Sequence, residues 1–182
     1  MKQFPLAILA LVLAIPTLAQ NQPSAGWVPD GLQVLRQAAS SKTEFTLDHS
    51  MLVLASKLDS DNEDLRRVIA GVSGLSVHSY HYADQWAYDP AAVDSVKEQY
   101  HAAGWKQLVN NHDKSSGGAT DLWIRFENNA ISNIAVLLTR SHEVNLIEVT
   151  GSISPLDLSH LGGHFGIPRI EGGVLVPNTA RR

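Results

Sequence analysis

Residues 121–139 read DLWIRFENNAISNIAVLLT. In the first part of this stretch every second side chain is apolar, at Leu122, Ile124 and Phe126. A period of two is typical of a strand with one buried face. The pair Asn128-Asn129 tolerates the positive φ angles of a tight turn, and the apolar run 130–139 follows it. The stretch therefore predicts a β-hairpin.

The segments on either side of this hairpin also have strand character. Residues 105–110 precede it, and residues 143–151 follow it with apolar side chains at Val144, Leu146, Ile147 and Val149. Four consecutive strands joined by short polar loops predict an antiparallel meander, on which helices can bury their apolar sides.

A further strand and a helix are predicted before the meander. Residues 74–82 alternate and are rich in aromatic side chains, as strands are. The helix after them has Asp89 as its cap, Pro90 as its first residue and Gly104 at its end. We therefore expect an α+β fold with a mainly antiparallel sheet of about five strands. It combines one helical crossover with the four-strand meander, and its helices lie mostly on one face.

Shorter elements surround this framework. Asp48 and Asp61 are each predicted to cap a helix, and Glu44–Leu47 is predicted to form a short strand. A short helix is expected from Ser154, and the tail from Gly166 is expected to be mostly irregular. The predicted organisation is a signal peptide over 1–19, a linker with a short helix over 20–42, one α+β domain over 43–168 and a tail over 169–182.

The N-terminal segment predicts export. Lys2 supplies a positive charge, residues 4–15 form an apolar stretch too short to span a bilayer, and Ala19 is a small residue of the kind that precedes cleavage. The alternative is a retained N-terminal anchor helix. The chain has no cysteine, so the domain is stabilised without disulfides. We expect a periplasmic or secreted bacterial protein whose mature chain does not span a membrane.

Charge argues against nucleic-acid binding. The chain carries 14 basic and 18 acidic residues, a formal net charge of −4, with no clustered basic stretch.

The sequence assigns no catalytic residue, metal ligand or cofactor. His78 and His81 would point to opposite faces of a strand, so a metal site would need partners from elsewhere, such as His101, His112 or His142. The segment Gly71–Gly74 contains a serine but lacks the spacing of a nucleophile elbow. An enzyme is therefore left open without a supporting motif.

Aromatic residues suggest a binding surface. The candidates lie at the end of the strand over 74–82 and in the loop after it: His78, Tyr80, His81, Tyr82, Trp86 and Tyr88. Aromatic rings with polar tips are common where proteins recognise sugars or other proteins. The alternative is that these rings anchor the loop to the helix that follows.

A second candidate is one face of the sheet. If Ile134, Val136 and Leu138 face the helices, then Ala135 and Leu137 point to the opposite face, near Trp123. An uncovered apolar face would mark a partner site. The alternative is that the tail, with Ile170 and residues 174–176, folds back to cover it.

The order of short motifs along the chain resembles a known family. The motifs are Phe45–Asp48, Val72–Tyr80, Gly104-Trp105 and Leu156–Pro168, the last containing Leu-Gly-Gly-His-Phe-Gly-Ile-Pro. They resemble the bacterial domain of unknown function 4252 (DUF4252), over roughly residues 45–168. The resemblance implies an exported bacterial domain and assigns no catalytic residue.

The function we expect is that of a non-enzymatic binding or regulatory module of the cell envelope, with an envelope protein as partner. One alternative is a small envelope hydrolase or metal-dependent enzyme that uses His78 or His81 with an acid from a loop. This alternative requires a concave pocket in which a histidine lies within hydrogen-bonding distance of an acid or a second histidine. Another alternative is a carbohydrate-binding module using Trp86 and the nearby tyrosines.

Overall fold

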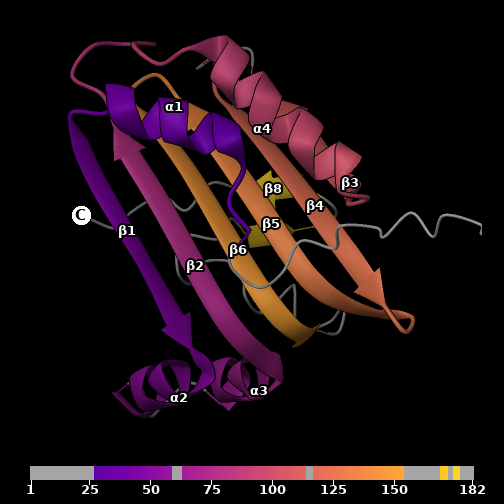
Figure 1. Ribbon diagram of the computed structural model, residues 1–182. Coiled ribbons are helices and arrows are strands. Elements are labelled where there is room, and N and C mark those ends of the chain that lie inside the picture. Colours follow the sequence, from indigo (N-terminus) through magenta and orange to yellow (C-terminus); the bar gives the residue numbers. More distant parts are fainter. Residues whose placement is uncertain (1–26, 59–62, 114–116, 154–168, 172–173, 177–182) are drawn as a thin grey trace, which may run out of the picture.

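Six antiparallel strands form the main sheet of the protein, in the order β1-β2-β6-β5-β4-β3 (Figure 1). The computed structural model describes residues 27–58, 63–113, 117–153, 169–171 and 174–176. The strands are β1 (Ser41–Asp48), β2 (Val72–His81), β3 (Lys106–His112), β4 (Ala119–Glu127), β5 (Ala130–Arg140) and β6 (Glu143–Ile153). The α+β class and the antiparallel sheet are confirmed. The expected number of strands is wrong by one, and β1 is longer than the short strand predicted at Glu44–Leu47.

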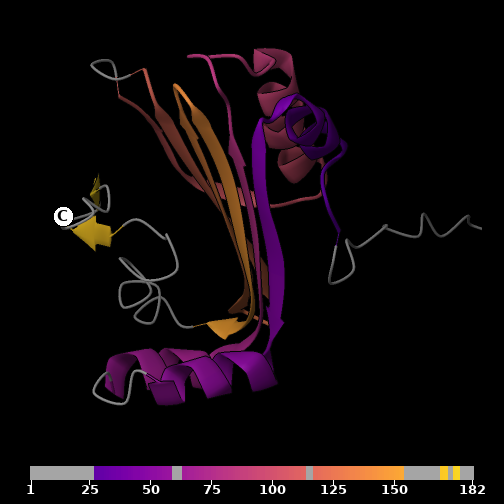
Figure 2. The same cartoon turned by 90° about the vertical axis from the view of Figure 1, so that its left-hand side faces the viewer.

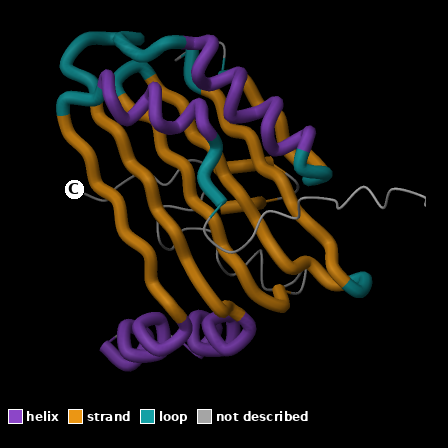
Figure 3. The backbone as a smooth tube through the Cα atoms, in the orientation of Figure 1, coloured by secondary structure: helices purple, strands orange, loops and turns teal. Residues whose placement is uncertain are grey.

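Within the described residues, four helices accompany the sheet: α1 (Asp30–Ala38), α2 (His49–Leu58), α3 (Glu63–Gly71) and α4 (Pro90–Ala102). In Figures 1 and 3, α1 and α4 cross one face of the sheet, while α2 and α3 lie at one end of it. Two predicted caps are confirmed, because the backbone N–H of Ala91 donates to Asp89 and that of Met51 donates to Asp48, both over 2.9 Å. The predicted cap at Asp61 lies outside the described residues.

The predicted hairpin joins β4 to β5. Asn128 and Asn129 have φ angles of 49° and 62°, so both adopt the left-handed conformation expected of them. The pairing of the two strands is shifted between Arg125 and Phe126, which marks a β-bulge close to the turn.

Each face of the sheet carries its own apolar core. On the face covered by α1 and α4, here called the helix-bearing face, the core includes Tyr80, Tyr100, Trp123 and Leu146. On the opposite face it includes strand residues such as Val136, together with Leu52 of α2 and Ile69 of α3. The central strands are therefore buried on both sides.

The expectation that Trp123, Ala135 and Leu137 lie on an uncovered face is wrong. Trp123, Ala135 and Leu137 each have 0 % of their surface exposed and belong to the core beneath α1 and α4. Their strand neighbours Ile134 and Val136 belong to the opposite core. Because β5 is apolar on both sides, its alternation separates two sets of residues but does not identify the set that α1 and α4 cover. Trp123, Ala135 and Leu137 therefore do not form an exposed interaction face.

The tail contains two short strands that were not expected. β7 (Arg169–Glu171) and β8 (Val174–Val176) pair as a separate two-stranded sheet. Figure 2 shows this pair on the side of the main sheet away from α1 and α4. The predicted signal peptide and the predicted helix from Ser154 lie outside the described residues. None of the helices among the described residues is long and apolar enough to cross a membrane.

Candidate functional site

The tyrosines proposed as a binding surface lie in the core. Tyr80 and Tyr82 are 1 % exposed and Tyr88 is 6 % exposed, whereas Trp86 is 43 % exposed. The Tyr82 hydroxyl donates to the carbonyl of Leu35 in α1 over 2.9 Å, and burial raises the pKa of Tyr82 to about 12. These contacts favour the anchoring role, because three of the four rings join the strand and its loop to the helices.

The two candidate histidines have separate surroundings. The exposed ring of His81 stacks on that of His142, with 6.1 Å between ring centroids. His78 is partly buried and its Nδ1 lies 3.4 Å from a carboxylate oxygen of Glu44. Among the described residues, no three histidine, aspartate or glutamate side chains gather as metal ligands.

Polar residues occupy the part of the helix-bearing face next to the apolar core. We call this set the polar floor: Glu44, Thr46, Ser76, His78, Glu148 and Thr150. Glu44 and Thr46 of β1 lie opposite His78 and Ser76 of β2, and Ser76 lies opposite Glu148 of β6. Ser76 and His78 share the face of Tyr80, since alternate residues of a strand point the same way. The pairing of three strands therefore brings two acids, a histidine and three hydroxyl groups onto one surface.

Glu44 is the centre of the first cluster in this floor. Tyr80 donates its hydroxyl hydrogen to Oε1 over 2.6 Å, and Arg36 of α1 donates from Nε to Oε2 over 3.0 Å. The hydrogen bond from Tyr80, the hydrogen bond from His78 and the charge of Arg36 outweigh desolvation and hold the pKa of Glu44 below its usual value. Glu44 is therefore an ionised carboxylate at neutral pH.

The contacts of His78 determine the tautomer of its neutral ring. An ionised carboxylate only accepts hydrogen bonds, so Nδ1 of His78 carries the hydrogen that points to Glu44. Nε2 is then the acceptor, and the Ser76 hydroxyl lies 3.2 Å from it. Ser76, His78 and Glu44 thus form a continuous hydrogen-bonded chain.

A groove lies over this cluster, and we call it the α1 groove. Its volume is about 620 Å³. Its polar lining comes from Gln33, Arg36 and Gln37 of α1 and from Glu44, Thr46, His78 and Tyr80 of the sheet. Its apolar side-chain lining comes from Val28 and Leu32; Phe45 also borders the groove, but its side chain points to the opposite face with that of its strand partner Val77. The groove therefore meets the geometric requirement of the enzyme alternative, because a histidine within reach of an acid lines it.

Glu148 forms a second acidic centre, which was not predicted from the sequence. Tyr100 of α4 donates its hydroxyl hydrogen to Glu148 over 2.5 Å. The Tyr100 ring stacks on Trp123 with 4.8 Å between centroids and meets Trp105 edge-on. Burial raises the pKa of Glu148 to about 7, although the hydrogen bond from Tyr100 lowers it. An acidic residue inside the otherwise apolar strand segment 146–149 could have indicated this centre.

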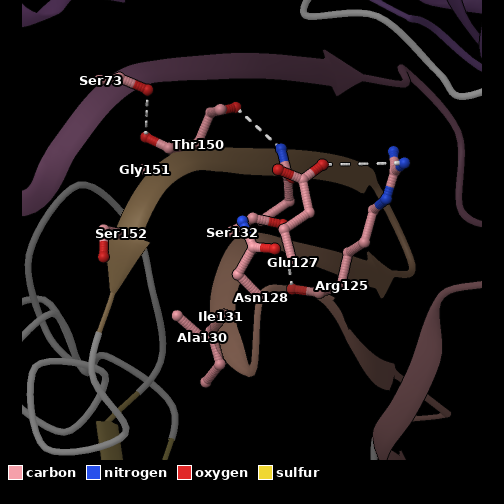
Figure 4. Close-up of a pocket in the computed structure, with 11 residues that line it drawn as sticks. Ser73, Arg125, Glu127, Asn128, Ala130, Ile131, Ser132, Thr150, Gly151 and Ser152 are labelled. Atoms are coloured by element: carbon pink, nitrogen blue, oxygen red, sulfur yellow. Dashed lines mark hydrogen bonds and ion pairs between the residues drawn. The ribbon is translucent and has the colours of Figure 1, made fainter.

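A second cavity, of about 460 Å³, is lined by residues of β2, β4, β5 and β6 (Figure 4). The pairing of these strands changes register near it. Asn133 donates its amide to the Thr150 hydroxyl over 3.1 Å, and Ser73 donates to the Thr150 carbonyl over 3.0 Å. Gly151 has a φ of 153°, and a Cβ at this position would overlap the carbonyl of Gly71. The polar groups in this cavity bind one another, which favours a structural role.

Comparison with known proteins gives one match. The family model described as domain of unknown function (DUF4252) matches residues 38–161. No curated protein and no solved structure matches the chain. Since the family model covers more than half of the sequence, the chain belongs to the DUF4252 family.

Proposed function

We propose that this protein is an exported module of the bacterial cell envelope that binds a ligand in the α1 groove. The proposal of export rests on the positive charge, the short apolar stretch and Ala19 in the N-terminal segment. The proposal of binding rests on one observation. An ionised carboxylate with three donors lies in an open groove that also has an apolar lining.

The lining favours a ligand that is apolar at one end and polar at the other. Val28 lines the groove and is 41 % exposed, so apolar surface is available there. The Arg36 side chain is 57 % exposed and its guanidinium has further N–H groups beyond the one that meets Glu44. A short aliphatic chain carrying an anionic or ester group matches both features. An envelope protein partner would supply or remove this ligand.

Titration of isotope-labelled protein, residues 20–182, with hexanoate tests the binding site. We expect amide NMR shifts in α1, β1 and β2 that saturate, and no comparable shifts with glucose, which lacks the apolar chain. Val28→Ser should weaken binding. Val34→Ser is the matched control, because Val34 is 47 % exposed but does not line the groove. Shifts that saturate elsewhere, or equal effects of both variants, would contradict the assignment.

Export has its own test. The full chain should be recovered from the periplasm or medium with residues 1–19 removed, whereas a chain without those residues should stay in the cytoplasm. Recovery of the uncleaved chain in the membrane fraction would favour the retained anchor instead.

A hydrolase is the second candidate function, favoured by the hydrogen-bonded chain from Glu44 through His78 to Ser76. The carbohydrate alternative loses support, since the tyrosines that would have accompanied Trp86 are buried.

A further inference from the structure

We propose that Ser76, whose hydroxyl lies 3.2 Å from Nε2 of the groove residue His78, is a nucleophile that accepts the acyl group of a short aliphatic ester bound in the α1 groove, with His78 as its general base. This inference rests on the proposed function, because the groove must first hold the ligand. It adds a reaction to what would otherwise be a binding site.

The geometry follows the logic of a serine, histidine and acid triad. Ser76 Oγ lies 3.2 Å from Nε2 of His78, and Nδ1 of the same ring lies 3.4 Å from Oε1 of Glu44. The base must accept the serine proton at one nitrogen while the other nitrogen is held by an acceptor. The hydrogen-bond roles derived above give His78 that tautomer.

Glu44 is a positioning residue in this arrangement. The Tyr80 hydroxyl and the Arg36 guanidinium fix its two oxygens, at 2.6 Å and 3.0 Å respectively. A fixed, ionised carboxylate orients the imidazole and stabilises the imidazolium that forms when Ser76 loses its proton.

Other serines of the same strand lack this environment. Ser73 donates its hydroxyl to the carbonyl of Thr150. Ser79 points to the other face, since it is an odd number of residues from Ser76. His81 of the same strand stacks on His142. Ser73 and His81 therefore provide matched controls within β2.

The reaction balances with water as the second substrate. Ser76 Oγ attacks the ester carbonyl carbon while its proton moves to Nε2 of His78. The tetrahedral intermediate collapses, the carbon–oxygen bond to the alcohol breaks, and the alcohol takes the proton from His78. Water then attacks the acyl-serine in the same way, which releases the carboxylic acid and restores the Ser76 hydroxyl.

The oxyanion of the intermediate has few donors here. The backbone N–H groups of β2 serve the pairing with β1 on one side and β6 on the other. The Thr46 hydroxyl, 3.4 Å from Ser76 Oγ, is the nearby side-chain donor. Loss of one oxyanion donor costs an enzyme roughly 100- to 1,000-fold in rate. We therefore expect slow turnover, and a reagent with a good leaving group is the appropriate probe.

The test uses the protein comprising residues 20–182 with p-nitrophenyl butyrate. We expect a burst of nitrophenolate and a butyryl group on Ser76, located by peptide mass spectrometry. Ser76→Ala should abolish the adduct, and His78→Gln should slow its formation about 100-fold, a typical general-base contribution. Ser73→Ala and His81→Ala should react as the unaltered protein does. Glu44→Gln should slow acylation, and Glu44→Asp, which keeps a carboxylate to orient His78, should slow it less.

Several results would overturn the proposal: no adduct, an adduct on another residue, or equal rates for His78→Gln and His81→Ala. The hexanoate titration separates this failure from that of the proposed function. If hexanoate binds the groove of unaltered protein and of Ser76→Ala but no acylation occurs, only the nucleophile assignment fails. If hexanoate does not bind there, the binding proposal fails as well. Circular dichroism of each variant confirms that the fold is retained.

Discussion

The helix-bearing face contains two tyrosine–glutamate hydrogen bonds, and the pKa values of the two glutamates are shifted in opposite directions. Tyr80 donates to Glu44 over 2.6 Å, and Tyr100 donates to Glu148 over 2.5 Å. The pKa of Glu44 lies below its ordinary value, whereas that of Glu148 rises to about 7. The same chemical pair therefore gives an ionised carboxylate in one place and a carboxyl group near half-protonation in the other.

The difference comes from what surrounds each pair. Glu44 also receives hydrogen bonds from Arg36 and His78, and its side chain is 29 % exposed. The carboxyl group of Glu148 has Tyr100 as its donor and lies beside the stacked rings of Tyr100 and Trp123. One neutral donor does not offset desolvation there, so the protonated form is favoured. Glu44 is therefore suited to orienting His78, whereas Glu148 is suited to the protein interior.

The largest expected effect comes from Glu148→Gln. The folded protein raises the pKa of Glu148 from 4.5 to about 7, so it binds the proton more tightly than the unfolded chain does. The stability from this proton is fully present below pH 4.5 and is lost as pH rises through about 7. A shift of this size corresponds to at most about 3 kcal/mol.

Glutamine keeps the acceptor for Tyr100 but cannot ionise. We therefore expect Glu148→Gln to unfold with the same free energy as the unaltered protein near pH 4, and with up to about 3 kcal/mol more near pH 8. Urea unfolding at both pH values measures this. Equal stability changes at the two values would show that Glu148 titrates normally.

Tyr100→Phe should have the next largest effect. It leaves the Glu148 carboxyl group without its donor, at a cost of about 1–3 kcal/mol, while the ring packing on Trp123 is kept. The loss should be greater near pH 8 than near pH 5, because the ionised form depends most on the donor. A loss independent of pH would contradict this role for the hydroxyl group.

Much of the scaffold could be predicted from local sequence. Asn128-Asn129 predicted the hairpin, because the turn depends on the φ angles of these two residues. Asp89 predicted the start of a helix, because a cap acts within the first turn. Alternation along β2 also placed Ser76, His78 and Tyr80 on one face.

The site depends on contacts that local sequence does not specify. Tyr80 and Glu44 are 36 residues apart, and Tyr100 and Glu148 are 48 residues apart. The first pair requires β1 to lie beside β2, and the second requires α4 to pack on β6. Because β5 is apolar on both sides, its sequence also did not show which face α1 and α4 cover. The site could therefore not be predicted from motifs, because the sequence contains its residues but does not show that they lie together.

Tyr80→Phe should have a smaller effect than Tyr100→Phe. Glu44 keeps Arg36 and His78 as donors, so we expect a loss of about 1 kcal/mol near pH 7. Because the pKa of Glu44 is lowered, its contribution is present above the ordinary value of 4.5 and is lost as pH falls below it. The loss caused by Tyr80→Phe should therefore diminish on acidification, which unfolding near pH 3 can measure. A larger loss than that of Tyr100→Phe would reverse the comparison.

The smallest effect is expected from Arg36→Ala. The Arg36 side chain is 57 % exposed, and an exposed ion pair contributes less than about 1 kcal/mol. Urea unfolding in low and high salt should show this small loss shrinking as salt screens the pair. A salt-independent loss of several kcal/mol would mean that Arg36 has a packing role.

The most direct test of the difference between the two centres is an NMR titration of the glutamate side-chain carboxyl carbons, assigned with Glu44→Gln and Glu148→Gln. We predict that Glu148 titrates near pH 7 and Glu44 titrates below 4.5. If both carboxyl groups titrated near 4.5, the two surroundings would be equivalent, and they would not shift the pKa values of Glu44 and Glu148 in opposite directions.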